Sequence, residues 1–527
     1  MNHFVRSTTT QQLHLFVTAV ACSLLLAVPG CGIPKLCHPE PVRQLPETFN
    51  GEVSGENSSQ MGIDEFFEDP TLTGLIDEGL AGSLQLKILG QEIEIANNEI
   101  LRRRGAYLPF VTIGGRAGLD KPSFFTPGGA SEEQLLAANG RGFPSPLPDF
   151  MVATNLSWQI DIWRQLRNAR DAATLRYLGT CDGRNYVVTR LVAEIAENYY
   201  ALMALDRRLE TLDRTIALQE QSLVMAQAQK EGVRGTELGV QRFRAEVRKN
   251  QSQKLITKQD IIEVENRINF LVGRFPQPVE RNSAAFFELS LRPLSLGVPS
   301  DLLQNRPDIR QAERELSAAG LDIAVAKANF YPKLNISAGV GYDAFNPRYL
   351  VVSPESLVYS VAGDLVAPLI NKTNIQADYK NANARQLQAV YDYQRTVLNA
   401  FTEVINRISK VQNYTNSIEL KKQQLESLEA SVTVATALFN ATRVEYIDVL
   451  FAQRDLQEAR MVLIETKKEQ LGAIVNTYQA LGGGLIQFSY PIAGPPGSEP
   501  ALPSPSDPAD DTAIPVPPTP AKPDENQ

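Results

Sequence analysis

The chain has 527 residues, of which 43% are hydrophobic and 21% are charged, a balance that excludes both a bundle of membrane helices and a disordered polymer. Its formal net charge is -9. A nucleic-acid-binding protein needs a basic surface to displace counterions, so we expect no nucleic-acid partner.

The first 30 residues have the organisation of a secretion signal. Arg6 gives a positively charged start, and an apolar run extends from Leu13 through Val28. The run ends at Pro29-Gly30-Cys31, where a small residue directly precedes a cysteine, as at a lipoprotein cleavage site. We predict a lipoprotein signal peptide at 1–30 and lipidation of Cys31; the alternative is an ordinary signal peptide with an incidental cysteine. Gly32 follows, rather than the Asp that favours inner-membrane retention, so the expected location is the outer membrane of a double-membraned bacterium.

Residues 31–70 are expected to form an acylated linker before the body of the chain. Two further cysteines, Cys37 and Cys181, lie outside the signal and the lipid site. Two interpretations remain open: a disulfide between them, which an oxidising periplasm permits, or two unrelated buried thiols.

The body of the chain repeats one layout twice, in a first repeat at 71–275 and a second at 301–488. Each repeat is expected to contain a helix, a strand, a surface loop, a return strand and two very long helices. The first strand of each repeat follows a similar corner, Ala106-Tyr107-Leu108-Pro109 and Asn329-Phe330-Tyr331-Pro332. Proline disfavours helical geometry at the residue before it, so a helix should end at each corner. Loops are expected at Asp120–Asp149 and Ala344–Glu355.

Two runs in each repeat alternate between apolar and polar side chains. The clearest apolar sets are Leu334, Ile336, Ala338, Val340 and Tyr342, then Leu357, Tyr359, Val361 and Leu365. In the first repeat, Val152–Ile160 alternates cleanly and Leu108–Leu119 less so. Runs of about ten residues can cross a bilayer as tilted strands, with one face to lipid and one to water. The alternative is an ordinary antiparallel sheet with one wet face.

The long helices are indicated by apolar residues at steps of three and four. These stripes are Leu191, Ile195, Tyr199, Leu202, Leu205, Leu209, Leu212 and Ile216, and later Leu398, Phe401, Ile405, Ile408 and Val411. A helix from about Trp163 to Lys230 would be ~100 Å long at about 1.5 Å per residue. This length favours an antiparallel coiled coil over a compact domain.

Short turns close the two helical hairpins. The first is Glu231-Gly232-Val233-Arg234-Gly235, whose glycines are expected to supply a left-handed helix end. The second lies near Asn440-Ala441-Thr442-Arg443.

Two segments have no helical or strand periodicity. Residues 276–300 are rich in proline and are expected to connect the repeats, and a helix restarts at Arg306-Pro307-Asp308-Ile309-Arg310. The tail at 489–527 consists largely of Pro, Ala, Ser and Asp, so it is expected to be disordered.

The chain has little of the chemistry that catalysis requires. Its three histidines are His3, His14 and His38, of which two fall in the predicted signal. No histidine triad or histidine metal cluster is therefore expected in the body. Carboxylate pairs such as Glu194 with Glu197 are expected on solvated helix faces. We predict no catalytic, cofactor or metal site, and that the protein is not an enzyme.

Four crossing strands are too few for a membrane barrel, because known bacterial barrels have at least about eight. Open strand edges are not tolerated in lipid. Copies of the chain are therefore expected to share one barrel, with the long hairpins forming a helical tube below it. Such an assembly would be a conduit.

The sequence resembles the outer-membrane efflux-duct family typified by TolC, especially its lipoprotein branch. The run from Leu302 to Glu313, LLQNRPDIRQAE, is close to that branch's LLxxRPDIRxAE signature. Ala326–Pro332 matches its helix-to-strand corner, Ser157–Trp163 is similar to its first-repeat strand end, and Leu481-Gly482-Gly483-Gly484 is similar to its close. The resemblance covers nearly all of residues 70–488.

The resemblance implies an α+β efflux duct that is a homotrimer. Each chain would give four transmembrane β-strands to a shared twelve-stranded barrel, and antiparallel coiled-coil helices to a periplasmic α-barrel. The implied partners are a periplasmic adaptor (membrane fusion) protein, an inner-membrane pump and outer-membrane lipid. The chain itself would be a passive, gated conduit for small molecules in a tripartite efflux system, lipid-anchored in the outer membrane and extending into the periplasm.

The resemblance also implies a gate at the periplasmic end of the second hairpin. Asp448 matches an acidic gate position, and Phe451 stands where relatives often carry another Asp, so a more apolar constriction is expected. Arg443 is the third predicted gate residue. Adaptor contacts are expected at the hairpin tips, at Gly232, Val233, Arg234, Gly235, Thr442 and Glu445.

Two other functions remain open from the sequence. One is a type I secretion duct for polypeptides; the lipid anchor and the RPDIR run favour small molecules. The other is a lipid-anchored periplasmic coiled-coil scaffold, which does not explain the alternating strands.

Overall fold

The repeated layout begins with helices that lead into strands. The computed structural model describes residues 33–37, 45–46, 48–49, 61–132, 134–137, 140–232, 235–289, 291, 295, 297–441 and 443–484. A short helix, α2 (Ile63–Phe67), lies within the segment 31–70, for which a linker is expected. The helices of the first repeat are α3 (Pro70–Gly82), α4 (Leu84–Gly105), α5 (Pro127–Glu132), α6 (Gln165–Glu231) and α7 (Glu237–Val272), and its strands are β1 (Phe110–Asp120) and β2 (Leu147–Ile160). β2 therefore begins inside the loop expected at Asp120–Asp149, which also contains α5.

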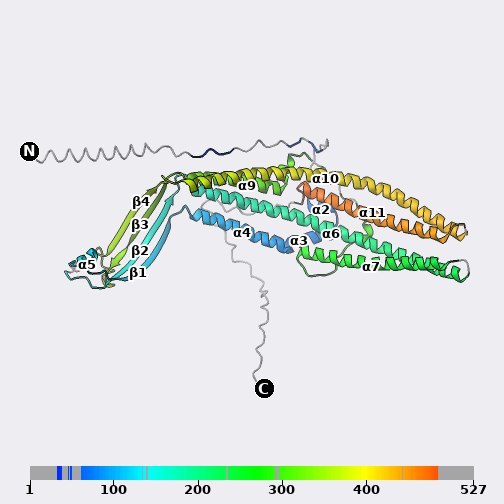
Figure 1. The fold of residues 1–527 in the computed structure, drawn as a ribbon, viewed down its shortest axis with the longest axis horizontal. Coiled ribbons are helices and arrows are strands. Elements are labelled where there is room, and N and C mark those ends of the chain that lie inside the picture. The colour runs from blue at the N-terminus through cyan, green and yellow to red at the C-terminus, as the bar shows by residue number, and fades with distance from the viewer. Residues whose placement is uncertain are drawn as a thin grey trace, which may run out of the picture. The chain divides into compact units, whose positions relative to one another are not determined.

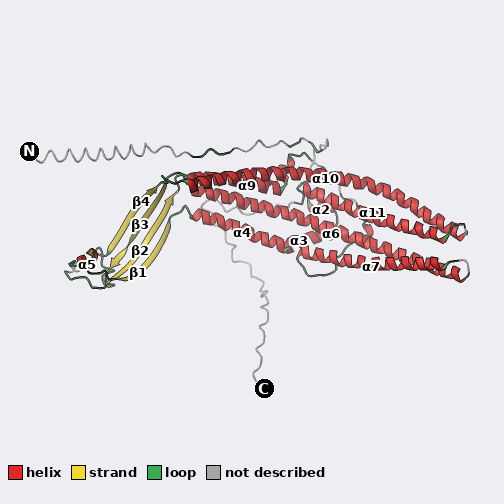
Figure 2. Cartoon of the chain, in the orientation of Figure 1, coloured by secondary structure: helices red, strands yellow, loops and turns green. Residues whose placement is uncertain are grey.

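The second repeat has the same order (Figure 1). After a short 3-10 turn η2 (Ser283–Ala285), its elements are α8 (Asp301–Asn305), α9 (Pro307–Ala328), β3 (Lys333–Ala344), β4 (Leu357–Val366), α10 (Thr373–Asn440) and α11 (Tyr446–Ala480). Figure 2 shows the four strands grouped together and the long helices running side by side. Among the described residues, no helix combines the length and apolar character needed to cross a membrane.

Local chemistry sets the start of the longest helix of the first repeat. The carboxylate of Asp161 accepts hydrogen bonds from the backbone N–H groups of Leu166, at 3.1 Å, and Arg167, at 2.9 Å. These donors belong to the first turn of α6 and have no partner within the helix. Arg164, just before the helix, has a φ of 57°, so the chain turns sharply out of β2 into α6.

The first hairpin turn differs from the expectation. Gly232 has a φ of -77°, so the expected left-handed conformation is wrong for Gly232. A Cβ on Gly235 would lie 3.0 Å from the backbone nitrogen of Lys230. Glycine is therefore needed there for close backbone approach.

The four strands form one antiparallel sheet in the order β1-β2-β3-β4. Directly opposed residues in antiparallel strands place their side chains on the same face. One row across the sheet is Val111, Leu156, Ala338 and Val361, and another is Ile113, Thr154, Val340 and Tyr359. The predicted alternation is thus confirmed, and the register joins the apolar sides of all four strands into one face.

Aromatic residues join the sheet to the helices. The indole N–H of Trp158 donates to the carbonyl of Tyr107 at 3.0 Å, and that of Trp163 donates to the carbonyl of Pro332 at 2.8 Å. Trp163 also stacks on Tyr331, with ring centroids 4.7 Å apart. Each repeat's corner is therefore bound to the end of β2 or to the segment that follows it.

The main core lies where the two repeats meet, and α6 supplies much of it. The predicted stripe of α6 is confirmed: Leu191, Ile195, Tyr199, Leu202 and Leu212 are buried. The stripe predicted for α10 is partly wrong, because Leu398 is 66% exposed in the single chain. Near Leu398 the buried residues of α10 are instead Ala400 and Val404, so the contact face of this part of the helix is rotated away from Leu398.

Arg306 is the most deeply buried cation of this core and is only 2% exposed. Its guanidinium donates to Asp308 Oδ1 at 3.0 Å and Oδ2 at 2.8 Å, to Glu403 Oε2 at 3.0 Å and to the carbonyl of Ala480 at 3.0 Å. Burial alone would lower the pKa of Arg306, but the two carboxylates raise it above its ordinary value. Arg306 therefore remains charged and links the start of α9 to α10 and to the end of α11.

The glycines after α11 pack against the same region. Gly482 has a φ of +95°, and a Cβ there would lie 2.6 Å from the carbonyl oxygen of Asn305. A Cβ on Gly483 would fall 2.3 Å from the ring of Tyr478, whose hydroxyl donates to the carbonyl of Met61 at 2.6 Å. Two of the four motifs that carry the family resemblance thus form one contact, which we call the Arg306 junction (Arg306, Asp308, Glu403, Ala480 and Gly482).

Both described cysteines are free thiols, with Cys37 exposed and Cys181 buried. The disulfide alternative is therefore wrong. The alternative of two unrelated thiols holds, except that Cys37 is not buried.

Gly482→Ala is expected to lower the melting temperature of the protein by several degrees. A non-glycine residue at this φ costs about 1–3 kcal/mol, and the new methyl group would clash with Asn305. Gly90→Ala is the matched control, because no atom lies within 4 Å of its Cβ position in α4. That change should leave the melting temperature unchanged or slightly raise it. Equal melting temperatures for both variants in circular dichroism would contradict the packing described.

Candidate functional site

The sheet presents a candidate lipid-facing surface. Its apolar face is widely exposed in the single chain, including Ile113, Val340, Tyr359, Val361 and Leu365. The opposite face carries polar groups, among them Arg116 and Asp149, whose charged atoms are 3.3 Å apart. β1 and β4 each pair with one strand only, so both outer edges of the described sheet are open. Such edges can accept another strand, and a single chain leaves them unsatisfied.

A short N-terminal segment packs against the end of α9 and against α10, which the sequence did not predict. Ile33 and Leu36 pack against a cluster that includes Phe330 and Tyr379 of the second repeat. The side chain of Asn383 accepts from the backbone N–H of Cys37 at 3.0 Å and donates to its carbonyl at 3.2 Å. Cys31 lies outside the described residues, but Ile33 follows two residues later and is held near the start of β3.

The tip of the first hairpin is closed by charge and capping. Lys230 and Glu237 form an ion pair of 2.5 Å across the turn. The hydroxyl of Thr236 accepts from the backbone N–H of Gly239 at 3.3 Å, which caps α7. Of the predicted adaptor contacts, Gly232 and Gly235 lie in this turn, and Val233 and Arg234 lie outside the described residues.

The tip of the second hairpin carries the predicted gate residues. Asp448 lies exposed in the first turn of α11, and Glu445 stands at the N-cap position of that helix. Arg443 is exposed and its backbone N–H donates to the carbonyl of Leu438 at 3.0 Å. Both Arg443 and Asp448 are described, and no ion pair joins them. Thr442 lies outside the described residues.

Phe451 and Leu450 point to different surroundings. Phe451 is 44% exposed, and the guanidinium of Arg454 lies over its ring at 5.0 Å. Leu450 is buried among Ala226 of α6 and Val240 and Phe243 of α7. The gate candidates Asp448 and Phe451 therefore flank a side chain that fastens α11 to the first hairpin.

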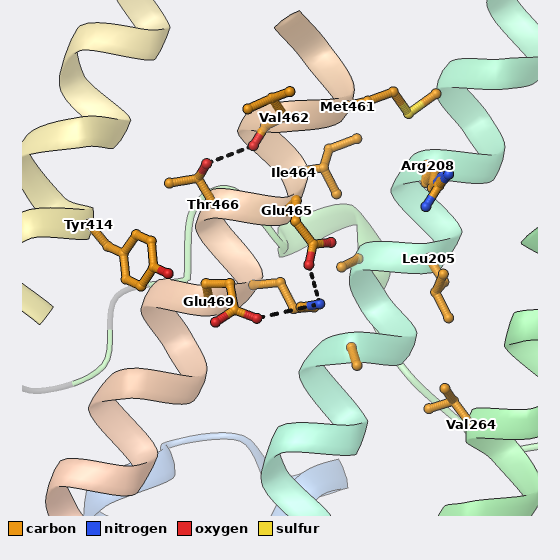
Figure 3. A pocket seen from close by; sticks show the side chains of 13 residues that line it. Leu205, Arg208, Val264, Tyr414, Met461, Val462, Ile464, Glu465, Thr466 and Glu469 are labelled. Atoms are coloured by element: carbon orange, nitrogen blue, oxygen red, sulfur yellow. Dashed lines mark hydrogen bonds and ion pairs between the residues drawn. The ribbon is translucent and has the colours of Figure 1, made fainter. Parts of the chain in front are cut away.

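A pocket of about 580 Å³ lies farther from the hairpin tips, between α6, α7, α10 and α11 (Figure 3). Leu205, Arg208, Tyr414 and Ile464 are among the residues that line it. Lys468 forms ion pairs with both Glu465 and Glu469, the latter at 3.6 Å. The hydroxyl of Thr466 donates to the carbonyl of Val462 at 2.7 Å. All of these contacts lie within α11, and the paired groups include no activated nucleophile.

The carboxylates expected on solvated helix faces differ in their surroundings. Glu194 forms an ion pair with Arg267 of α7. Glu197 faces α11, where the side-chain amide of Asn476 donates to it, so the expectation of a solvated pair is wrong. Burial raises the pKa of Glu197, and the hydrogen bond from Asn476 opposes this effect. Among the described residues, no group of His, Cys, Asp and Glu is placed to hold a metal ion.

The comparisons with known proteins agree with this geometry and confirm the resemblance. The family model described as outer membrane efflux protein matches residues 75–274 and 298–483. The solvent efflux pump outer membrane protein SrpC of Pseudomonas putida is 26% identical over 472 residues, covering 87% of this chain and 97% of SrpC. The cation efflux system protein CusC of Escherichia coli strain K12 is 25% identical over 473 residues, covering 88% of this chain and 99% of CusC.

A solved structure has the same fold. The open state of the MtrE outer membrane channel of Neisseria gonorrhoeae superimposes with a TM-score of 0.74 at 20% identity, covering 86% of this chain and 98% of MtrE. The family model spans both repeats, including the sheet, both hairpins and the Arg306 junction. The chain therefore belongs to the outer membrane efflux protein family, whose members form the outer-membrane part of efflux pumps.

Proposed function

We propose that the chain is the passive outer-membrane duct of a tripartite efflux system and carries small molecules to the exterior as a homotrimer. The observation that carries this proposal is the continuous apolar face across four strands whose two outer edges are open. Three copies joined edge to edge would close a twelve-stranded barrel with an apolar outside and a polar inside. The hairpins of the three copies would continue this barrel as a helical tube in the periplasm.

The energy for transport is proposed to come from another component of the efflux system. The sequence has no phosphate-binding loop of the GxxxxGK[ST] kind, so energy would come from an inner-membrane pump. A periplasmic adaptor would meet the hairpin tips at Gly232–Gly235 and at Thr442 and Glu445. The chain would then act without catalysis or cofactor.

The gate is proposed at the start of α11. Asp448 is exposed there, Arg443 lies in the turn just before α11, and Phe451 offers a half-exposed ring. In a closed ring of three copies, these side chains would narrow the periplasmic end. The cargo is proposed as small molecules because SrpC is named for solvent efflux and CusC for cation efflux, and both names describe small cargo.

The lipid anchor is proposed at Cys31. The docked segment at 33–37 supports it, because Asn383 and the cluster around Phe330 hold this segment close to the start of β3. Two residues of extended chain span about 7 Å, so an acylated Cys31 would be within reach of the membrane surface.

Charge on the apolar face should block membrane insertion. Val361→Arg would place a cation toward lipid near the middle of β4, at a cost of about 2–4 kcal/mol per chain. We expect the variant to be lost from the outer-membrane fraction. Ala362→Arg is the matched control, because the next residue lies on the polar face and should be tolerated. Equal recovery of both variants from isolated outer membranes would contradict the proposed barrel.

Single-channel recording in planar bilayers tests the duct itself. The purified protein, cross-linked to count its subunits, is expected to be a trimer with discrete conductance steps. Asp448→Ala, alone or with Arg443→Ala, should raise the conductance because the periplasmic end loosens. Glu458→Ala, an exposed carboxylate farther along α11, should not. A correctly folded monomer without conductance would indicate the scaffold function. If Asp448→Ala has the wild-type conductance, Asp448 is not part of the gate.

Cys31→Ser is expected to abolish the incorporation of labelled palmitate while leaving membrane insertion possible. Cys37→Ser is the control, because Cys37 is exposed yet should carry no lipid. Palmitate that still enters Cys31→Ser would show that the lipid site is elsewhere.

A further inference from the structure

One face of α10 carries large apolar side chains that the single chain leaves exposed. They are Tyr391, Leu398, Leu420 and Val434, and each is at least 51% exposed. At about 100° per residue, all four lie within about 40° of one another around the helix. α10 therefore has an apolar stripe along much of its length, separate from the face that buries Ala400 and Val404.

α4 carries a stripe of the same kind. Leu84, Ile88 and Ile95 are exposed at steps of four and seven residues, on the side of the helix opposite the buried Leu86 and Ile93. Such steps are typical of a helix that packs against a second helix along one seam. Because Leu86 belongs to the main core, the exposed stripe of α4 faces away from the chain's own core.

α7 continues the edge formed by α4 toward the hairpin tips. Leu255 and Ile262 of α7 are exposed and one heptad apart. The end of α7 abuts the junction of α3 and α4, where the carbonyl of Gly82 leaves no room for a Cβ on Gly273. α4 and α7 thus lie along one side of the helical body, and α10 lies along the other (Figure 1).

Each of these two sides continues one open edge of the sheet. α4 leads into β1, and α10 follows β4. β1 and β4 are the outer strands of the described sheet. If β1 of one copy pairs with β4 of the next, as the proposed barrel requires, the helices attached to these strands are brought together as well.

The apolar positions also match in height. At about 1.5 Å per residue, Ile88 lies about 26 Å from the end of α4, and Tyr391 lies about 27 Å from the start of α10. Near the tips, Leu255 lies about 27 Å from the start of α7, and Leu420 lies about 30 Å from the end of α10. Ile88 is therefore level with Tyr391, and Leu255 with Leu420.

We propose that α10 of each copy packs along α4 and α7 of the next copy, in one seam that runs from the strand edges toward the hairpin tips. This inference rests on the proposed shared barrel and assigns the helix surfaces through which its copies meet. The partner is a second copy of this chain, because the two stripes lie on opposite sides of one chain, match in height and continue the two open strand edges. A head-to-tail contact of this kind closes into a ring. The exposure of Leu398 then has a cause, since the neighbouring copy covers this side chain.

Disulfides between copies test the seam in the full chain. Ile88→Cys with Tyr391→Cys is made in a Cys37→Ser background, because Cys37 is exposed and Cys181 is buried. Mild oxidation is expected to give disulfide-linked dimers and trimers on a non-reducing gel. Ile88→Cys with Val434→Cys is the matched control, because Val434 lies on the same face of α10 at a different height and should leave monomers. Equal cross-linking of both pairs would contradict the seam.

A second pair and an independent count of subunits separate the seam from the barrel. Leu255→Cys with Leu420→Cys should also give disulfide-linked trimers. Amine-reactive cross-linking of the same samples counts the subunits without using the seam. Trimers in the amine reaction, with no disulfide between copies in either cysteine pair, would overturn the seam and leave the shared barrel in place. Monomers in both reactions would overturn the barrel and the seam together.

A charge within the seam should weaken the trimer. Leu398→Glu would place a carboxylate without a partner between two copies, so the trimer should dissociate at a lower temperature in size-exclusion chromatography after stepwise heating. Val224→Glu is the matched control, because Val224 is about as exposed as Leu398 but lies on α6, between the two sides. Leu398→Met should keep the wild-type behaviour. Equal dissociation temperatures for Leu398→Glu and Val224→Glu would overturn the seam at this level.

Discussion

The fold depends most on a buried positive charge. A guanidinium that is removed from water must keep its full set of hydrogen-bond partners, and Arg306 finds them on its own segment and on two segments that are distant in sequence. Asp308 comes from its own helix, Glu403 from the middle of α10, and the carbonyl of Ala480 from the end of α11. Because this arrangement admits no side chain at Gly482, the motif around Arg306 and the glycines that close α11 constrain each other.

The long helices are held more firmly at the Arg306 junction than at the hairpin tips. The junction holds the long helices together at one level, where Leu302, Ala400 and Val404 are buried. Near the hairpin tips, a small cluster around Leu450 joins α11 to the first hairpin. The N-terminal end of α11 should therefore move more easily than its C-terminal end, which is held at the Arg306 junction. Such movement would allow a channel to open at the hairpin tips.

Features with a regular period were predictable from the sequence. The alternation in β3 and β4 and the stripe of α6 each follow from a local pattern that one buried or lipid-facing surface imposes. Contacts between distant segments were not: nothing near Cys37 indicates that Asn383 binds its backbone, and Glu197 faces Asn476 only because α6 meets α11. The motif at Arg306 resembles a family signature, but the sequence does not show that Arg306 is buried. That burial depends on its contacts with Glu403 and Ala480, which are distant in the sequence. A glycine in a turn can be needed for a left-handed conformation or for close approach of two backbone segments. The sequence favoured the first reason for the turn after α6, whereas Gly235 shows the second.

The open edges of β1 and β4 have a genetic consequence. In the proposed ring, the β1 edge of each copy pairs with the β4 edge of its neighbour, so the contact between copies is head-to-tail. The ring therefore closes only when every copy has both of these edges free to pair. A chain with one edge blocked, for example by proline within β4, would still join one neighbour and then stop the ring. Expressed beside a normal copy, such an allele would be dominant, since the fraction of intact rings falls as a power of the fraction of normal chains.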